Sequence, residues 1–211
     1  MYKKKSLGQH FLHTPSYLNA VADAADIQKG ETVLEIGPGE GALTQVLLER
    51  GAKVVALEKD SRLISVLREK FAGKDFEVLE GDALEFEPEF AHYKVIGNIP
   101  YYITGALFKK FLTVRRQPSV LVFLVQKEVA ERIARSKKES ILSLSIKAYG
   151  TPAYIKTVPA GAFTPPPSVD SAILAVSHIS RNNFKNAAHE EKFFEAVKKG
   201  FGQKRKFLKN F

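Results

Sequence analysis

The sequence predicts an α/β fold in which helices cover both faces of a mostly parallel sheet. Short apolar stretches alternate with helical patterns through the first 150 residues, which is typical of successive β-α-β units. The run at 120–125 contains no polar side chain, as expected of a central strand buried on both faces. Two late strand patterns, at 153–158 and 171–176, are joined by a Pro-rich link without a helix, which indicates an antiparallel pair at one edge.

The first part of the chain contains three strand patterns that each end at a possible ligand-binding residue. A helix is expected at 15–25, because Thr14 can cap it and Pro15 suits its first position. The following elements are a strand at 32–36, a helix at 42–50, a strand at 53–57, a helix at 61–71 and a strand at 76–79. These strands run into a glycine loop, into Glu58 and into Asp82 respectively.

The second part continues with an apolar run at 93–99, which we interpret as a buried strand ending in Asn98-Ile99-Pro100-Tyr101. The remaining helices are expected at 104–112, 128–135, 140–149 and 190–201. We found no internal repeat.

Length and composition limit the possible classes of protein. A chain of 211 residues with 45% hydrophobic residues can form one domain plus an appendage. No apolar run approaches the ~20 residues of a membrane span, and the basic start lacks the apolar stretch of a signal peptide. The absence of Cys excludes disulfides and thiolate metal sites, and five scattered His suggest no metal site. We therefore expect a cytoplasmic, metal-free protein.

The net charge of +9 is unevenly distributed along the chain. Between residues 31 and 89 there are 14 acidic and 7 basic residues, so this part carries −7 and the remainder +16. Basic residues gather in four stretches, at 3–5, 109–116, 127–138 and 198–209. A single basic run is usually a solvated surface, but four of them favour a polyanionic partner such as a nucleic acid.

The tetrapeptide at 98–101 has the chemistry to hold a flat aromatic amine. Open α/β sheets bind ligands at the carboxyl ends of their strands, where this segment is expected. The Asn98 amide offers an acceptor, Pro100 has a carbonyl but no N–H, and the Tyr101 ring offers a stacking face. The alternative is that these residues only terminate the strand in a turn.

The glycine loop and three carboxylates suggest a nucleotide-like cofactor. Gly37, Gly39 and Gly41 between a strand and a helix allow close approach to a ligand, and alone fit NAD, FAD or S-adenosyl-L-methionine. Glu58 can accept from ribose hydroxyls, and Asp82 can accept from an adenine amino group, although either residue can be structural. Glu35 before the glycines would repel a pyrophosphate but attract the ammonium of S-adenosyl-L-methionine, which favours that cofactor.

Several motifs, in order, resemble the KsgA-type ribosomal RNA adenine dimethyltransferases. They are residues 6–12 (SLGQHFL), 35–41 (EIGPGEG), 98–101 (NIPY), 126–130 (QKEVA), 163–171 (FTPPPSVDS) and 202–206 (GQKRK). The resemblance implies a Rossmann-like class I S-adenosyl-L-methionine-dependent methyltransferase with a mostly parallel seven-stranded sheet. It also implies an enzyme that dimethylates two adjacent adenosines in the 3′-terminal hairpin of small-subunit ribosomal RNA during ribosome biogenesis. We expect this enzyme to be a monomer.

The resemblance also implies a set of site residues. Cofactor contacts are expected at His10, Leu12, Gly37, Glu58, Asp82 and Asn98. The target adenine is expected between Tyr101 and Phe163, with its amino group held by Asn98 and the Pro100 carbonyl.

The sequence departs from the family pattern in three places. His10 stands where Asn is more usual, and Ser168 replaces a frequent Lys. Family members carry a helical C-terminal domain, so we expect a catalytic domain at 1–180 and a truncated start of the helical domain at 181–211. Two other functions remain open: an erythromycin-resistance-type methylase of large-subunit RNA, and a non-catalytic RNA-binding assembly factor.

Overall fold

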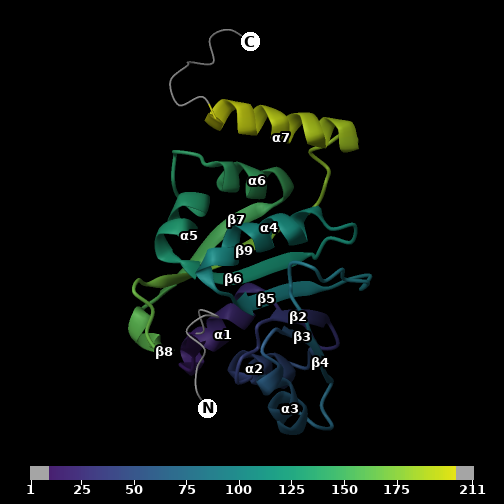
Figure 1. The fold of residues 1–211 in the computed structure, drawn as a ribbon, viewed down its shortest axis with the longest axis vertical. Coiled ribbons are helices and arrows are strands. Elements are labelled where there is room, and N and C mark those ends of the chain that lie inside the picture. The colour runs from purple at the N-terminus through teal and green to yellow at the C-terminus, as the bar shows by residue number, and fades with distance from the viewer. Residues whose placement is uncertain (1–9, 203–211) are drawn as a thin grey trace.

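The computed structural model describes residues 10–202, and its centre is a seven-stranded sheet (Figure 1). The strand order is β4-β3-β2-β5-β6-β9-β7, with β9 antiparallel to both of its neighbours and all other pairs parallel. The strands are β2 (Thr32–Ile36), β3 (Lys53–Glu58), β4 (Phe76–Glu80), β5 (Lys94–Asn98), β6 (Val120–Gln126), β7 (Thr151–Val158) and β9 (Ser171–Ser177). The predicted mixed α/β sheet with an antiparallel pair at one edge is therefore confirmed.

The helices form a layer on each face of this sheet. The helices of these layers are α1 (Pro15–Ala24), α2 (Ala42–Glu49), α3 (Ser61–Lys70), α4 (Thr104–Thr113), α5 (Lys127–Ala134) and α6 (Ile141–Tyr149), and a further helix, α7 (Ala187–Gly202), lies outside α6. Alternate residues along each strand point to opposite faces. In β2, Val33 packs into a core with α1 and α2, whereas Leu34 packs into the core that contains α4, α5 and α6. No described helix between residues 10 and 202 has the length and apolar character to cross a membrane.

Side-chain hydrogen bonds fix the starts of three helices, α3, α6 and α7. Asp60 caps α3 by accepting from the Arg62 backbone N–H, and Ser140 forms a reciprocal capping box with Ser143 at the start of α6. The last helix begins three residues earlier than expected, because the Asn186 side chain accepts from the His189 backbone N–H at 2.9 Å. The sequence pattern therefore predicts where these helices lie, and the capping side chains determine the residue at which each helix begins.

A second, two-stranded sheet was not expected from the sequence. It pairs β1 (Phe11–Leu12) with β8 (Phe163–Thr164) in antiparallel register, Leu12 opposite Phe163. It lies within the N-terminal segment and the Pro-rich link, where the only other regular structure among the described residues is a 3₁₀ turn at Ala160–Ala162. This ladder joins segments about 150 residues apart and brings the N-terminal segment to the sheet.

The helix α7 packs on the outer side of α6 (Figure 1). The Tyr149 ring of α6 stacks near Phe194 of α7, with ring centroids 5.7 Å apart, and the Tyr149 hydroxyl donates to Glu190. Arg181 forms an ion pair with the same carboxylate at 3.4 Å. An aromatic contact and a charged network therefore join this segment to the rest of the described chain.

Candidate active site

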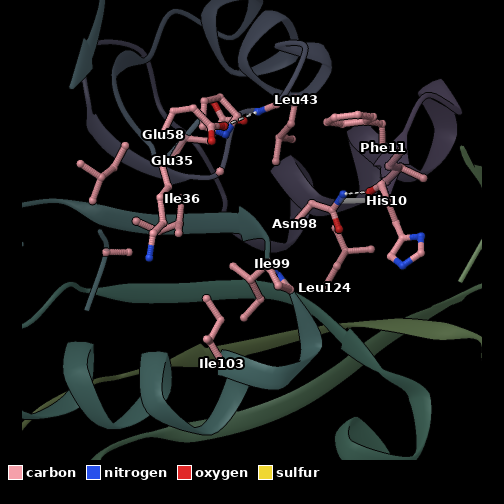
Figure 2. Close-up of a pocket in the computed structure, with 18 of the residues that line it drawn as sticks. His10, Phe11, Glu35, Ile36, Leu43, Glu58, Asn98, Ile99, Ile103 and Leu124 are labelled. Atoms are coloured by element: carbon pink, nitrogen blue, oxygen red, sulfur yellow. Dashed lines mark hydrogen bonds between the residues drawn. The ribbon is translucent and has the colours of Figure 1, made fainter. Parts of the chain in front are cut away.

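A cavity of about 340 Å³ lies at the carboxyl ends of β2, β3 and β5 (Figure 2). This volume falls within the ~300–1,000 Å³ of small-molecule sites. Ten of the residues predicted to bind cofactor or substrate line it: His10, Leu12, Glu35, Gly37, Gly39, Glu58, Asp82, Asn98, Pro100 and Tyr101. The other two predicted residues, Gly41 and Phe163, do not line it.

The glycine loop shapes one wall of the cavity. Gly37 and Gly39 have φ angles of +66° and +59°, a region that favours glycine. A Cβ at Gly39 would lie 2.6 Å from the Phe11 ring, so the loop and the N-terminal segment pack closely. Gly41 is instead the N-cap residue of α2, where a Cβ would meet the Phe71 ring at 2.6 Å. Gly41 therefore serves the packing of α2 against α3, and its cofactor contact stays a prediction.

The Glu58 carboxylate is held by backbone donors at the end of β3. It accepts from the N–H of Gly39 at 3.2 Å and from the N–H of Asp60 at 2.8 Å. Burial raises the pKa of Glu58, and these two hydrogen bonds oppose that rise. The carboxylate lies in the cavity wall beside the glycine loop, within reach of a ligand that donates hydroxyl groups (Figure 2).

The Asp82 carboxylate beyond β4 forms an ion pair with Lys59, which also lines the cavity. Lys59 Nζ lies 2.7 Å from Asp82 Oδ2, and Asp82 Oδ1 accepts from the Leu84 N–H at 2.9 Å. These hydrogen bonds lower the pKa of Asp82, and the bond to Asp82 raises the pKa of Lys59. Lys59 also lines the cavity, but in the sequence a Lys directly after Glu58 is indistinguishable from an ordinary surface charge.

Glu35 is a fully enclosed carboxyl group at the end of β2. It is 1% exposed and accepts from the Thr44 hydroxyl of α2 at 2.6 Å. Burial raises the pKa of Glu35 to about 7, and the nearby negative charge of Glu58 adds to the rise. Its place before the glycines was predicted, but no pattern in the sequence indicates the bond to Thr44 that joins β2 to α2.

The tetrapeptide 98–101, which begins with the last residue of β5, presents two acceptors to the cavity. Asn98 Nδ2 donates to the His10 backbone carbonyl at 2.7 Å, which leaves Asn98 Oδ1 as the acceptor (Figure 2). The Pro100 carbonyl accepts from the Ile103 N–H at 3.2 Å and retains a second lone pair. A bound amino group with two hydrogens matches this pair of neutral oxygens.

Tyr101 and the following residue form the outer wall. The Tyr101 hydroxyl is hydrogen-bonded to Ser171 Oγ at 2.6 Å, which fixes the ring, and burial raises the pKa of Tyr101. The Tyr101 ring lies nearly parallel to that of His10, with centroids 6.3 Å apart and planes 18° apart. Tyr102 also lines the cavity and is 72% exposed, yet a second Tyr beside the first has no separate signal in the sequence.

Phe163 lies away from the cavity in this structure. Its side chain is 4% exposed and packs in the core with Leu12, Val158 and Ile173. The structure therefore does not bring Phe163 and Tyr101 together around one space, and the sandwich of these two rings stays a prediction. Among the described residues, no group of three or more His, Asp or Glu side chains is arranged to hold a metal ion.

Comparison with known proteins gives a consistent set of relatives. The family model described as ribosomal RNA adenine dimethylase matches residues 1–211. The ribosomal RNA small subunit methyltransferase A of Dehalococcoides mccartyi strain CBDB1 is 43% identical, over 98% of this chain and 73% of the relative. The protein of the same name from Fusobacterium nucleatum is 39% identical, over 98% of this chain and 81% of the relative.

Two solved structures are similar over most of the chain. A dimethyladenosine transferase from Plasmodium falciparum aligns with a TM-score of 0.83 and 33% identity, covering 94% of this chain and 73% of that one. The 23S rRNA methyltransferase ErmE aligns with a TM-score of 0.81 and 31% identity, covering 92% and 80% respectively. Both similarities extend well beyond the glycine loop.

Proposed function

The chain belongs to the ribosomal RNA adenine dimethylase family, and we propose that it dimethylates adenine amino groups of small-subunit ribosomal RNA. It is an S-adenosyl-L-methionine-dependent methyltransferase. The observation that carries the proposal is the cavity itself, because carboxylates and glycines suited to the cofactor share one space with Asn98, Pro100 and Tyr101. Cofactor and adenine can therefore meet at the carboxyl edge of the sheet.

The residues of the cavity fit S-adenosyl-L-methionine, which supplies an electrophilic methyl group when bound. Glu58 would accept from the ribose hydroxyls, and Asp82 from the adenine amino group once Lys59 moves aside. Glu35 lies just before the glycine loop at the end of β2. The positive ammonium of a bound cofactor would favour the ionised form of the Glu35 carboxyl group. Gly37 and Gly39 have no side chains to block this approach, and the backbone around them adopts the conformation that glycine favours.

The role of Asn98 and Pro100 is to hold the amino group of the target adenine. Asn98 Oδ1 and the Pro100 carbonyl would each accept one amino hydrogen, which directs the nitrogen lone pair away from the ring. Both acceptors are neutral, so they position protons without abstracting them. Catalysis by this chain then consists of positioning and electrostatic stabilisation.

We base the proposed target nucleotides, oligomeric state and location on the family resemblance. We place the target at two adjacent adenosines of the 3′-terminal hairpin, in assembling small subunits, with a monomeric enzyme acting in the cytoplasm. The similarity to relatives named small subunit methyltransferase, at up to 43% identity, supports this substrate. We also keep the division at residue 180 as a proposal, with 181–211 as a separate C-terminal part.

Methylation of large-subunit RNA is the second candidate, because of the similarity to the 23S rRNA methyltransferase ErmE. Its identity of 31% is lower than that of the small-subunit relatives. A non-catalytic assembly factor is less consistent with the cavity, since Asn98, Pro100 and Tyr101 all line it.

Mass spectrometry of unmodified ribosomal RNAs, incubated with the protein and isotope-labelled cofactor, tests the proposal. We expect label in small-subunit RNA as N6,N6-dimethyladenosine. Asn98→Ala should lower turnover by about 100-fold or more, since it removes an acceptor that acts in the transition state. The matched variant Asn182→Ala changes an exposed residue outside the cavity and should not. Label in large-subunit RNA would support the second candidate, and a folded, cofactor-binding protein that labels neither RNA would contradict methyl transfer.

A further inference from the structure

Four of the side chains that line the cavity are exposed to solvent, and these form its rim. They are His13, Glu40, Lys59 and Tyr102. His13 Nε2 lies 4.0 Å from the Glu40 carboxylate, and Lys59 forms its ion pair with Asp82. The Tyr102 side chain, by contrast, has no hydrogen bond, ion pair or ring contact with any residue that the structure describes. Within the described part of the chain, the rim therefore presents one aromatic ring without a partner.

The other rings that line the cavity are held by contacts within the protein. His10 Nδ1 lies 2.8 Å from the Pro165 carbonyl, which can only accept, so Nδ1 donates. The Tyr101 hydroxyl is hydrogen-bonded to Ser171 Oγ at 2.6 Å, and the Tyr101 and His10 rings stack on each other. These contacts make both rings part of the wall, which distinguishes them from Tyr102.

Tyr102 carries its ring outward because of its place in the backbone. Tyr101 and Tyr102 are consecutive residues of a 3₁₀ turn, Tyr101–Ile103. Consecutive side chains in such a turn project about 120° apart, since three residues complete one turn. With Tyr101 fixed in the wall, Tyr102 extends into solvent and is 72% exposed, whereas the next most exposed large apolar side chain, Val66, is 46% exposed. A ligand that covers this ring would gain binding free energy from the apolar surface removed from water.

An RNA substrate needs a stacking surface near the place where its target base enters the cavity. A base that enters leaves the stack of its own strand, so a neighbouring base loses a partner. An aromatic side chain can replace that partner, and such stacking tolerates any base. The acceptors proposed for the target amino group, Asn98 and Pro100, line the same cavity as Tyr102 and belong to the same short segment. Tyr102 therefore lies where the strand beside the target base would pass.

We propose that Tyr102 stacks on the base of the nucleotide next to the target adenosine, so that it is an RNA-binding residue at the cavity rim. This inference rests on the proposed function and extends it from the target base to its neighbour. In a pair of adjacent target adenosines, the stacked neighbour of one would be the other. Tyr102 does not touch the reacting atoms; it holds the strand while the target base occupies the cavity.

A binding cycle with abasic RNA tests the proposal. The probe is a short oligouridine with one adenosine between two inosines, because the inosine base has no amino group. Either inosine is replaced by an abasic ribose, and affinity is measured by fluorescence anisotropy with the protein saturated with S-adenosylhomocysteine. For the wild-type protein, one of the two replacements should lower affinity by roughly 5- to 150-fold. Tyr102→Ala should bind the intact probe more weakly by the same factor, and neither abasic replacement should weaken it further.

Two variants and one ligand serve as controls. Tyr102→Phe keeps the ring and should behave as the wild type with all three RNAs. Val66→Ala removes an exposed apolar side chain of α3, outside the cavity, and should bind the probe normally. Affinity of Tyr102→Ala for S-adenosylhomocysteine, measured by calorimetry, should change less than about twofold, as expected of an exposed side chain. Weaker cofactor binding with unchanged RNA affinity would instead place Tyr102 over the cofactor and overturn the proposal.

The same measurements separate this inference from the proposed function. If the wild-type protein methylates small-subunit RNA, but the abasic replacements weaken wild type and Tyr102→Ala equally, only the Tyr102 assignment is refuted. The same holds if neither replacement affects the wild type. If the wild-type protein methylates no RNA and binds equally well when inosine replaces the central adenosine, the proposed function is refuted. Loss of affinity that still depends on Tyr102 would then show a base contact at the rim without methyl transfer.

Discussion

At the scale of single residues, Glu35 has a consequence for stability that can be measured without substrate. Burial raises the pKa of this carboxyl to about 7, well above its ordinary value of 4.5. The folded protein therefore binds the Glu35 proton more tightly than the unfolded chain does. It follows that the free energy of unfolding falls as pH rises from about 4.5 to about 7, by about 3 kcal/mol, and then stays lower.

Glu35→Gln should remove this pH dependence in the cofactor-free protein. The glutamine oxygen can still accept from Thr44, but it carries no proton to lose. We expect the stability of the variant relative to wild type to increase from about pH 5 to pH 8 by up to about 3 kcal/mol. Urea denaturation at several pH values measures it, with Glu69→Gln, an exposed carboxylate on α3, as the control. Parallel stability curves for wild type and Glu35→Gln would show that the carboxyl is not perturbed.

At the scale of elements, Gly41 separates the packing of α2 from binding in the cavity. Gly41→Ala forces a residue with φ of +79° into the left-handed region and places a Cβ 2.6 Å from Phe71. We expect a decrease of about 2–4 kcal/mol in stability, from backbone strain and overpacking together. Cofactor affinity of the folded protein should be unchanged, because Gly41 does not line the cavity.

Gly30→Ala is a matched control for this variant. Its φ is +84°, but a Cβ there would meet nothing within 4 Å, so only the backbone cost applies. Denaturation of both variants isolates the part of the destabilisation that comes from packing, and calorimetry with S-adenosylhomocysteine measures binding. Equal destabilisation of the two variants, or weakened cofactor binding in Gly41→Ala, would contradict our interpretation.

The elements that could be predicted are those with a local pattern. The apolar run before Asn98 became β5, and the proline signal at Pro15 located the start of α1, although the Thr14 side chain forms no capping hydrogen bond. The carboxylates Glu58 and Asp82 were found because strand ends in a parallel sheet share one edge. The β1–β8 ladder could not be found in this way, since two-residue strands have no periodicity and their partners are about 150 residues apart.

Contacts without a local sequence pattern also explain why two predicted site residues lie outside the cavity. Two motifs identify Gly41 and Phe163. Whether each residue faces the cavity or packs against another element depends on tertiary structure, which a motif does not contain. Phe163 lies opposite Leu12 in the β1–β8 ladder and is buried in the core, and Gly41 packs against the Phe71 ring at the end of α3.

Two of the basic stretches, at 3–5 and in most of 198–209, lie outside the described residues.

At the scale of the whole molecule, the acidic and the basic parts of the sequence occupy different regions of the fold. The acidic part, with a net charge of −7, forms β2, β3 and β4 with α2 and α3, at one end of the sheet (Figure 1). The basic stretches within the described residues lie on α4, on α5, in the loops that follow these two helices, and at the end of α7. Lys137 and Lys138 in the loop after α5 are exposed. An RNA backbone is therefore expected to approach the molecule from this side.

Affinity for RNA should fall steeply with salt, and Lys137 and Lys138 should contribute to the slope. Replacing both by Ala should reduce the log–log salt slope by about 0.7 for each phosphate of a single-stranded RNA that the variant no longer neutralises. The matched pair Lys53→Ala and Lys74→Ala removes two exposed charges from the acidic part and should leave the slope unchanged. Fluorescence anisotropy titrations at several salt concentrations measure it. Equal slopes for the two double variants would remove this loop from the RNA-binding surface.

The hydrogen bond between His10 and Pro165 also sets an order of events during synthesis of the protein. The glycine loop and β2 to β5 are all translated before Pro100, whereas the carbonyl that holds the His10 ring follows 155 residues after that ring. A growing chain can therefore assemble much of the parallel sheet while the N-terminal strand still lacks its partner β8. The His10 ring can be held by the Pro165 carbonyl only when translation has passed Pro165, so a shorter nascent chain lacks the contacts that fix the N-terminal strand beside the cavity.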